Sequence, residues 1–195
     1  MKIGVLALQG DFEAHCAMLA SLGVDALEVR DVSGLQGLDG LVLPGGESTT
    51  QLKFLQEEGL FDPLRRFAAE GGAIFGTCAG AILLAREVRN PAQASLGLLD
   101  ISVLRNAYGR QLHSEVRFGH TSLKPAPLEM VFIRAPIIER VGPGVEILAE
   151  EQGTPVLVRQ GNLLASTFHP ELTSDPAVHS CFLHMAADRL RAVAT

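Results

Sequence analysis

Short apolar segments alternate with helical segments along the chain, and this alternation limits its fold more than any other feature. Strands are expected near residues 2–8, 25–29, 39–43, 73–75, 101–104, 145–148, 155–158 and 163–168. Helices are expected at residues 11–22, 49–57, 60–70, 79–88 and 175–192. The early alternation predicts an α/β fold whose central sheet is mostly parallel with helices on both faces, and the strand-rich later part predicts an antiparallel extension.

The length of the chain favours a single domain spanning residues 1–195. A chain of this size buries roughly 70% of the surface that its unfolded form exposes, which is enough for a substantial core. No repeat or low-complexity linker divides the sequence. We therefore expect little chain to be left for a second catalytic module.

A cysteine lies where an expected strand turns into an expected helix, in residues 73–85. Gly76 and Gly80 stand two residues before and after Cys78, and they allow a tight turn in which strand and helix pack closely. A helix N-terminus favours negative charge on the sulfur, and the thiolate is the nucleophilic form of cysteine. Cys78 is therefore a candidate nucleophile, the alternative being a buried cysteine in a packing turn.

A second candidate group follows the last expected strand, in residues 168–173. Residues two apart in an extended segment point the same way, so His169 and Glu171 are expected to share one side, with Pro170 stiffening the backbone between them. A histidine paired with a carboxylate is suited to act as a general base oriented by its partner. Because α/β folds place their sites at the carboxyl ends of strands, we expect His169 to lie near Cys78.

A third strand runs into a glycine-rich turn at residues 43–50, whose sequence is LPGGESTT. Backbone N–H groups in such a turn can stabilise an oxyanion, and we expect one donor at Gly46 and a second at Ala79, the first residue of the cysteine helix. The alternative is an ordinary turn capped by Ser48 or Thr49. A phosphate-binding loop is disfavoured because no glycine-lysine-serine/threonine signature follows.

With these segments the chain resembles the class I, triad-type glutamine amidotransferases, and among them the glutaminase subunits of pyridoxal 5′-phosphate synthases. The resemblance spans the whole chain. It is carried by residues 5–10 (VLALQG), 43–50 (LPGGESTT), 75–80 (FGTCAG), 105–106 (RN), 109–111 (GRQ), 132–136 (FIRAP) and 168–173 (FHPELT).

The resemblance implies a flavodoxin-like architecture and specific roles for the residues that carry it. Cys78, His169 and Glu171 match the catalytic triad. The residues that match the L-glutamine site are Gly46, Glu47, Ser48, Arg105, Ile133 and Arg134. Gln9, at the end of the first strand, matches the position that relays docking of the synthase partner to the site.

The chemistry of free glutamine fits these side chains independently. A guanidinium binds a carboxylate through two parallel hydrogen bonds, so Arg105 and Arg134 are candidates for the α-carboxylate, and Glu47 is a candidate for the α-ammonium. The expected reaction converts glutamine to glutamate and ammonia through a thioester on Cys78, with no metal and no organic cofactor.

The resemblance also implies a partner. Ammonia released into water would be protonated and lost, so we expect it to pass directly to a separate pyridoxal 5′-phosphate synthase subunit within a large hetero-oligomer. Two alternatives remain open: the chain serves a different amidotransferase, or it is a regulatory binding module on the same fold.

Composition excludes several other classes. The net charge of −6 and the absence of a basic stripe disfavour nucleic acid, and no apolar stretch approaches the roughly 20 residues that span a bilayer. The start of the chain does not read as a signal peptide. The three cysteines, Cys16, Cys78 and Cys181, form no CxxC pair. We therefore expect neither a disulfide scaffold nor a zinc site, and a cytoplasmic location.

Overall fold

The computed structural model describes residues 1–106 and 114–193, and the side chains of 189–193 are not described. The GRQ segment at 109–111 lies outside the described residues. The helices are α1 (Phe12–Ser21), α2 (Ser48–Glu57), α3 (Phe61–Ala69), α4 (Ala79–Leu84) and α5 (Ala177–Val193). Two 3₁₀ segments are η1 (Val32–Leu35) and η2 (Pro170–Leu172).

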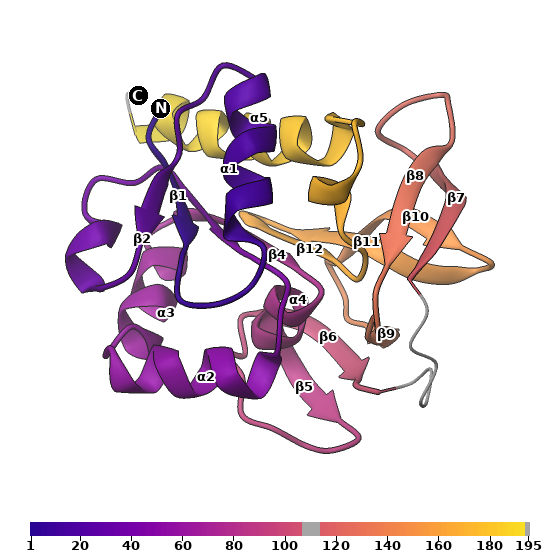
Figure 1. Ribbon diagram of the computed structural model, residues 1–195, viewed down its shortest axis with the longest axis horizontal. Helices are drawn as coiled ribbons and strands as arrows, with labels where there is room; N and C mark the ends of the chain where they lie inside the picture. The colour runs from indigo at the N-terminus through magenta and orange to yellow at the C-terminus, as the bar shows by residue number, and fades with distance from the viewer. Residues whose placement is uncertain (107–113, 194–195) are drawn as a thin grey trace.

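The strands of the described residues form two sheets (Figure 1). The large sheet has the order β2-β1-β3-β4-β12-β11-β10-β7-β8, and the small sheet has the order β5-β6-β9. The strands are β1 (Ile3–Leu6), β2 (Leu27–Val29), β3 (Gly40–Leu43), β4 (Ala73–Thr77), β5 (Ala85–Arg89), β6 (Leu99–Leu104), β7 (Glu115–Thr121), β8 (Leu128–Phe132), β9 (Ile137–Val141), β10 (Glu146–Glu151), β11 (Thr154–Gln160) and β12 (Leu163–Ser166).

The large sheet has a parallel half and an antiparallel half. The pairs β1–β2, β1–β3, β3–β4 and β4–β12 are parallel. The pairs β12–β11, β11–β10, β10–β7 and β7–β8 are antiparallel. The α/β class with an antiparallel extension, predicted from the alternation of elements, is confirmed.

Helices cover both faces of the parallel half, because its strands are apolar on both sides. On one face, Leu19 of α1 and Phe182 of α5 pack with Val5, Val42 and Phe75 of the strands. On the other face, α2, α3 and α4 pack against the alternate strand residues, and the small sheet joins this second core. In Figure 1, α1 and α5 lie above the sheet and α2 and α3 lie below it.

The prediction of a helix over residues 79–88 is wrong for the second half of this range. Helix α4 ends at Leu84, and Ala85 takes extended dihedral angles (φ −58°, ψ 143°). The chain continues as β5, in which Val88 is buried opposite Val103 of β6 while Glu87 and Arg89 are exposed. Pairing with a strand from later in the chain outweighs the local helical pattern here, because the pairing buries Val88 in the second core.

Three further strands were not predicted individually: β7, β8 and β9. Strand β7 leaves Val116 and Phe118 exposed, so its apolar residues do not mark a buried face. Helix α5 begins at Ala177, two residues after the expected start at 175, and Asp175 Oδ1 accepts a hydrogen bond from the N–H of Ala177 at 3.1 Å.

Two glycines hold the cysteine turn as the sequence predicted. A Cβ on Gly76 would lie 2.6 Å from the backbone of Gly80, and a Cβ on Gly80 would lie 2.1 Å from the carbonyl oxygen of Leu43. Since no side chain fits at either position, α4 can lie directly against β3 and β4. The loops after β3, β4 and β12 therefore meet at one edge of the sheet.

Candidate active site

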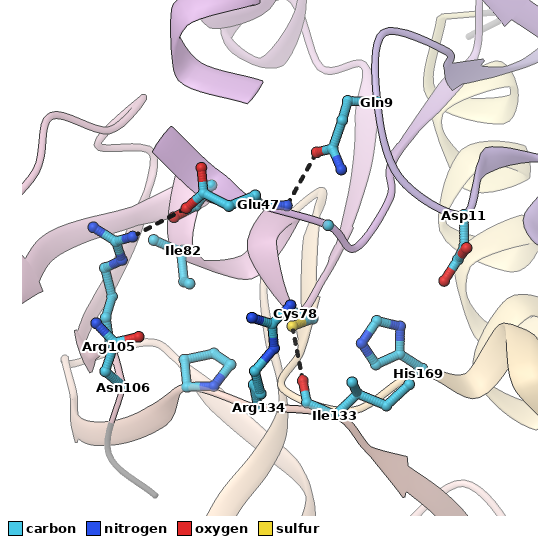
Figure 2. A pocket seen from close by; sticks show the side chains of 13 residues that line it. Gln9, Asp11, Glu47, Cys78, Ile82, Arg105, Asn106, Ile133, Arg134 and His169 are labelled. Atoms are coloured by element: carbon cyan, nitrogen blue, oxygen red, sulfur yellow. Dashed lines mark hydrogen bonds and ion pairs between the residues drawn. The ribbon is translucent and has the colours of Figure 1, made fainter. Parts of the chain in front are cut away.

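A cavity of about 260 Å³ opens where these three loops meet. Its size is just below the range of about 300–1,000 Å³ for small-molecule sites. It is lined by Gln9, Asp11, Gly46, Glu47, Ser48, Cys78, Ile82, Arg105, Asn106, Ile133, Arg134, Pro136 and His169 (Figure 2). Of the candidates from the sequence, only Glu171 and Ala79 do not line the cavity, and both adjoin residues that do: Glu171 contacts His169, and Ala79 follows Cys78.

Cys78 occupies the N-cap position of α4 in a conformation that L-residues rarely adopt. Its backbone has φ 47° and ψ −99°, and its N–H donates to the Ser166 carbonyl at 2.8 Å. Such dihedral angles cost of order 1–3 kcal/mol and persist where surrounding contacts impose them. The thiol is 6% exposed and lies 3.9 Å from the Ile133 carbonyl oxygen. A buried cysteine held in a strained turn and facing a cavity is arranged as a nucleophile would be.

His169 and Glu171 meet as predicted, but through a different backbone. The expected extended segment is instead a turn, in which His169 precedes the 3₁₀ segment Pro170–Leu172 that contains Glu171. His169 Nδ1 lies 2.7 Å from Glu171 Oε1, and both side chains are buried. The backbone N–H of His169 donates to the Val131 carbonyl at 2.8 Å, which fixes the turn against β8.

The surroundings of His169 favour its protonated form. Burial disfavours the charged imidazolium, but hydrogen bonds and charge interactions with Cys78 and Glu171 outweigh it and raise the pKa of His169 to about 10. An imidazolium beside a thiol favours the thiolate. Cys78 and His169 are therefore arranged so that the shared proton lies on His169 at neutral pH.

This raised pKa predicts a pH-dependent stability. Since the folded pKa of His169 lies above its ordinary value of 6.5, the stabilisation is fully present below pH 6.5 and is lost as the pH rises towards about 10. The free energies of unfolding of the wild type and of His169→Gln should therefore converge as the pH rises from 6.5 to about 10. Urea unfolding at several pH values measures this difference, and a gap that stays constant from pH 6.5 to 10 would contradict the shift.

The glycine loop after β3 lies against both Gln9 and His169. A Cβ on Gly45 would lie 2.3 Å from the imidazole ring of His169, and Gly46 has φ 144°. The backbone N–H of Glu47 donates to Gln9 Oε1 at 3.0 Å, as Figure 2 shows. The side chain of Gln9 thus contacts the loop that carries the predicted Gly46 donor.

The side chain of Glu47 is engaged more fully than the sequence indicated. Its Oε2 caps α2 by accepting from the N–H of Thr50 at 2.8 Å and from the hydroxyls of Thr49 and Thr50. Burial raises the pKa of this carboxyl, but these hydrogen bonds outweigh it and lower the pKa to about 2. Glu47 therefore presents a permanent negative charge, with Oε1 3.4 Å from Arg105. Ser48, which lines the same cavity, donates its hydroxyl to Gln93 at 3.1 Å.

Arg105 is a buried cation with binding capacity left over. The residue is 8% exposed, its Nη2 contacts Glu47, and its Nη1 is buried with no hydrogen-bond acceptor among the described residues. Figure 2 shows Arg105 and Arg134 approaching the cavity from two different segments. Arg134 is exposed and has φ 46°. The two guanidinium groups can receive an anionic group of a ligand in the cavity.

Four lining residues were not predicted individually. Asn106 and Pro136 lie inside segments on which the resemblance rests, and Ile82 lies one helical turn after Cys78. Asp11 follows the turn at Gly10, and no sequence motif marks it as a site residue. Behind the cavity, His15 and His179 are buried close to Glu171, and their separation of 164 residues hid this contact from sequence reasoning.

Among the described residues, one cluster has the composition of a metal site. Asp11, His169 and Glu171 each place a potential ligand atom within 4.8 Å of the others. Within this cluster, His169 Nδ1 already contacts the Glu171 carboxylate at 2.7 Å. Among the helices of the described residues, none is long and apolar enough to cross a membrane.

The chain resembles known proteins over almost its whole length. The model of the SNO glutamine amidotransferase family matches residues 5–188. Two relatives are named "Pyridoxal 5'-phosphate synthase subunit PdxT". The one from Koribacter versatilis is 58% identical over 95% of each chain, and the one from Deinococcus radiodurans is 53% identical over 97% of this chain and 99% of its own.

Solved structures agree at the level of the backbone. A structure described as "Crystal structure of glutamine amidotransferase" matches with a TM-score of 0.90 and 50% identity, covering 96% of this chain and 100% of its own. A structure described as "Structure of PurLQS from Thermotoga maritima" shares the fold, with a TM-score of 0.70 and 16% identity over 94% of this chain and 99% of its own. From the family match and the identities to the relatives, the chain belongs to the SNO glutamine amidotransferase family.

Proposed function

We propose that this chain is the glutaminase subunit of a pyridoxal 5′-phosphate synthase and hydrolyses L-glutamine to L-glutamate and ammonia. The observation that carries the proposal is one cavity in which Cys78 lies at a strained helix start beside the buried His169–Glu171 pair. The relatives at 50–58% identity that carry the name of this synthase subunit support the biosynthetic assignment.

The cavity offers complementary charges to both ends of the amino acid. The guanidinium group of Arg105, together with that of Arg134, is suited to the α-carboxylate of glutamine. The anionic Glu47 is suited to the α-ammonium. Gly46, Ser48 and Ile133 line the same cavity as Cys78. This arrangement directs the side-chain amide of glutamine at the sulfur.

In the first half of the reaction, Cys78 Sγ attacks the amide carbon of glutamine and the C=O electrons move to the oxygen. The backbone N–H groups of Gly46 and Ala79 stabilise this oxyanion. His169 then transfers its proton to the amide nitrogen, the C–N bond breaks, and ammonia leaves. The products are a γ-glutamyl thioester on Cys78 and a neutral His169.

In the second half, His169 takes a proton from water as the water oxygen attacks the thioester carbon. The second tetrahedral intermediate uses the same oxyanion donors, and its collapse breaks the C–S bond and releases glutamate. Glu171 remains an anion throughout and stabilises the imidazolium by its contact at 2.7 Å. Protein groups and water carry every step.

We propose that the ammonia passes to a separate synthase subunit within a large hetero-oligomer, and that Gln9 couples docking to catalysis. The support for Gln9 is its hydrogen bond to Glu47 N–H, which joins the turn after β1 to the oxyanion loop. A partner that contacts this turn would thereby move the backbone around Gly46. The cavity residues Gln9 and Asp11 belong to this turn.

We further propose that residues 1–195 form one domain that works in the cytoplasm. The single-domain proposal is supported by the large and small sheets sharing one hydrophobic core through α4. The location is supported by the three cysteines, all of which are free thiols, as is usual in a reducing compartment.

The function is tested by measuring glutamate release from glutamine by the full chain, alone and mixed with the pyridoxal 5′-phosphate synthase subunit of the same source. We expect hydrolysis to rise on mixing, and pyridoxal 5′-phosphate to form from glutamine, a pentose phosphate and a triose phosphate. Hydrolysis without formation of pyridoxal 5′-phosphate would assign the chain to another amidotransferase. No hydrolysis in either sample would favour a regulatory role.

Replacing Arg105 with alanine should raise the KM for glutamine by about 10- to 100-fold, since a hydrogen bond to a charged group contributes about 1.5–3 kcal/mol. The kcat should fall much less, because the carboxylate is bound equally in the ground state and the transition state. Steady-state kinetics of the complex measure both constants. Arg65→Ala, on the exposed side of α3, is the matched control, and an unchanged KM in Arg105→Ala would contradict the assignment.

A further inference from the structure

A second buried pair of side chains lies behind the proposed triad. His15 of α1 and His179 of α5 are both fully buried, and their Nδ1 and Nε2 atoms lie 2.9 Å apart. The other ring nitrogen of His15, Nε2, lies 3.5 Å from Glu171 Oε2 and 3.2 Å from the hydroxyl of Thr77. Thr77 directly precedes Cys78. The pair thus reaches the far side of the carboxylate whose near side contacts His169.

The two carboxylate oxygens of Glu171 differ in their contacts. Oε1 is engaged by His169 at 2.7 Å, whereas the buried Oε2 has no hydrogen bond of standard geometry among the described residues. Burying a carboxylate oxygen without a donor costs free energy, so a donor that faces this oxygen at 3.5 Å stabilises it. His15 Nε2 occupies that place.

Burial keeps both histidines neutral, and neighbouring histidines add to this effect at His15. Desolvation, together with the nearby His179 and His169, lowers the pKa of His15 well below its ordinary value. Desolvation lowers the pKa of His179 to about 4. Each ring therefore carries one N–H at neutral pH, and the 3.5 Å contact joins a neutral imidazole, not an imidazolium, to the Glu171 carboxylate.

The contacts select one arrangement of the two protons. If His15 carried its proton on Nδ1, the proton of His179 would lie on Nδ1, which is buried and has no partner among the described residues. In that arrangement a lone pair of His15 would also face the Glu171 carboxylate. The alternative places both protons on Nε2: His179 donates to His15, and His15 donates towards Glu171 and Thr77. This second arrangement leaves only a lone pair without a partner, so it is favoured.

We propose that His15 is a positioning residue that holds the second oxygen of the Glu171 carboxylate, and that His179 sets the tautomer in which His15 can do so. The inference rests on the proposed glutaminase function and deepens it. With both oxygens held, Glu171 keeps a fixed orientation towards His169, which in turn stays aligned with Cys78. The ring of Phe75 packs nearly perpendicular to both imidazole rings, at centroid distances of 6.0 Å and 5.6 Å, and this packing restricts their rotation.

The test compares His15→Gln with His15→Met in the complex with the synthase subunit. The two replacement side chains have the same length, but only glutamine offers N–H donors. We expect His15→Met to lower kcat for glutamine hydrolysis by about 10- to 100-fold with KM changed less than about twofold, and His15→Gln to recover most of the loss. His184→Leu, on the exposed side of the same helix as His179, is the control.

A second readout does not depend on glutamine. The rate at which iodoacetamide alkylates Cys78, followed by mass spectrometry of the peptide, should fall in His15→Met and recover in His15→Gln. Equal kcat values and equal alkylation rates in the two folded variants would overturn the proposal and leave His15 a packing residue. If His15→Met does not fold, His179→Leu takes its place: a several-fold fall in kcat supports the tautomer argument, and wild-type kcat contradicts it. A wild-type complex that alkylates normally but hydrolyses no glutamine would instead contradict the proposed function.

Discussion

Replacing Cys78 with alanine should abolish glutamine hydrolysis, with kcat falling by at least about 10⁴-fold, because removing a covalent nucleophile leaves only binding and oxyanion stabilisation. Alanine at this position keeps the strained turn and removes only the sulfur, so the fold should persist. Glutamate release by the complex with the synthase subunit measures the loss. Unchanged circular dichroism and melting temperature would show that the loss is chemical.

The other two thiols provide the controls. Cys16 and Cys181 are half-buried, and neither lines the cavity. Burial raises the pKa of both thiols, so they should react slowly with electrophiles. A chloroketone analogue of glutamine should therefore modify Cys78 alone, and Cys16→Ala and Cys181→Ala should remain active. Equal labelling of all three thiols would contradict the enzymatic role.

Replacing Glu171 with glutamine should lower kcat by about 10²- to 10⁴-fold, the range typical of neutralising the carboxylate of a triad. The amide is isosteric, but it lacks the charge that stabilises the His169 imidazolium, and it can donate where the carboxylate accepts. Without that charge the pKa of His169 should fall from about 10 towards its ordinary value. The pH dependence of kcat, together with titration of the imidazole by NMR, measures both effects.

An exposed glutamate supplies the matched control for this change. Glu150 of β10 is exposed, and Glu150→Gln makes the same chemical substitution away from the cavity. It should leave kcat and the titration of His169 unchanged. A Glu171→Gln variant that keeps wild-type kcat would remove the carboxylate from the proposed mechanism.

Part of the site could be predicted because its signals are local. The tight turn at Cys78 requires glycines two residues before and after the cysteine, and this spacing can be read directly from the sequence. The proximity of Cys78, His169 and the Gly46 loop follows from one rule of α/β sheets, that neighbouring parallel strands present their carboxyl ends together. Strands β3, β4 and β12 are such neighbours.

Other features could not be predicted because they depend on contacts between distant segments. The helix expected to continue past Leu84 gives way to β5, because pairing with β6 buries Val88. The turn that joins His169 to Glu171 is held by Val131, 38 residues earlier. His15 and His179 come together only when α1 and α5 pack on the same face of the sheet.

The sequence by itself determined the fold class, the family and the chemical types of the site, because each depends on residue patterns within short segments and on the order of those segments. Only the tertiary structure decided which groups have binding capacity left. Only Oε2 of Glu47 is engaged in the helix cap, Nη1 of Arg105 is left without an acceptor among the described residues, and the second oxygen of Glu171 turns towards His15. The physical reason is that hydrogen-bond partners and desolvation are set by atoms brought together through packing, which no spacing along the chain encodes.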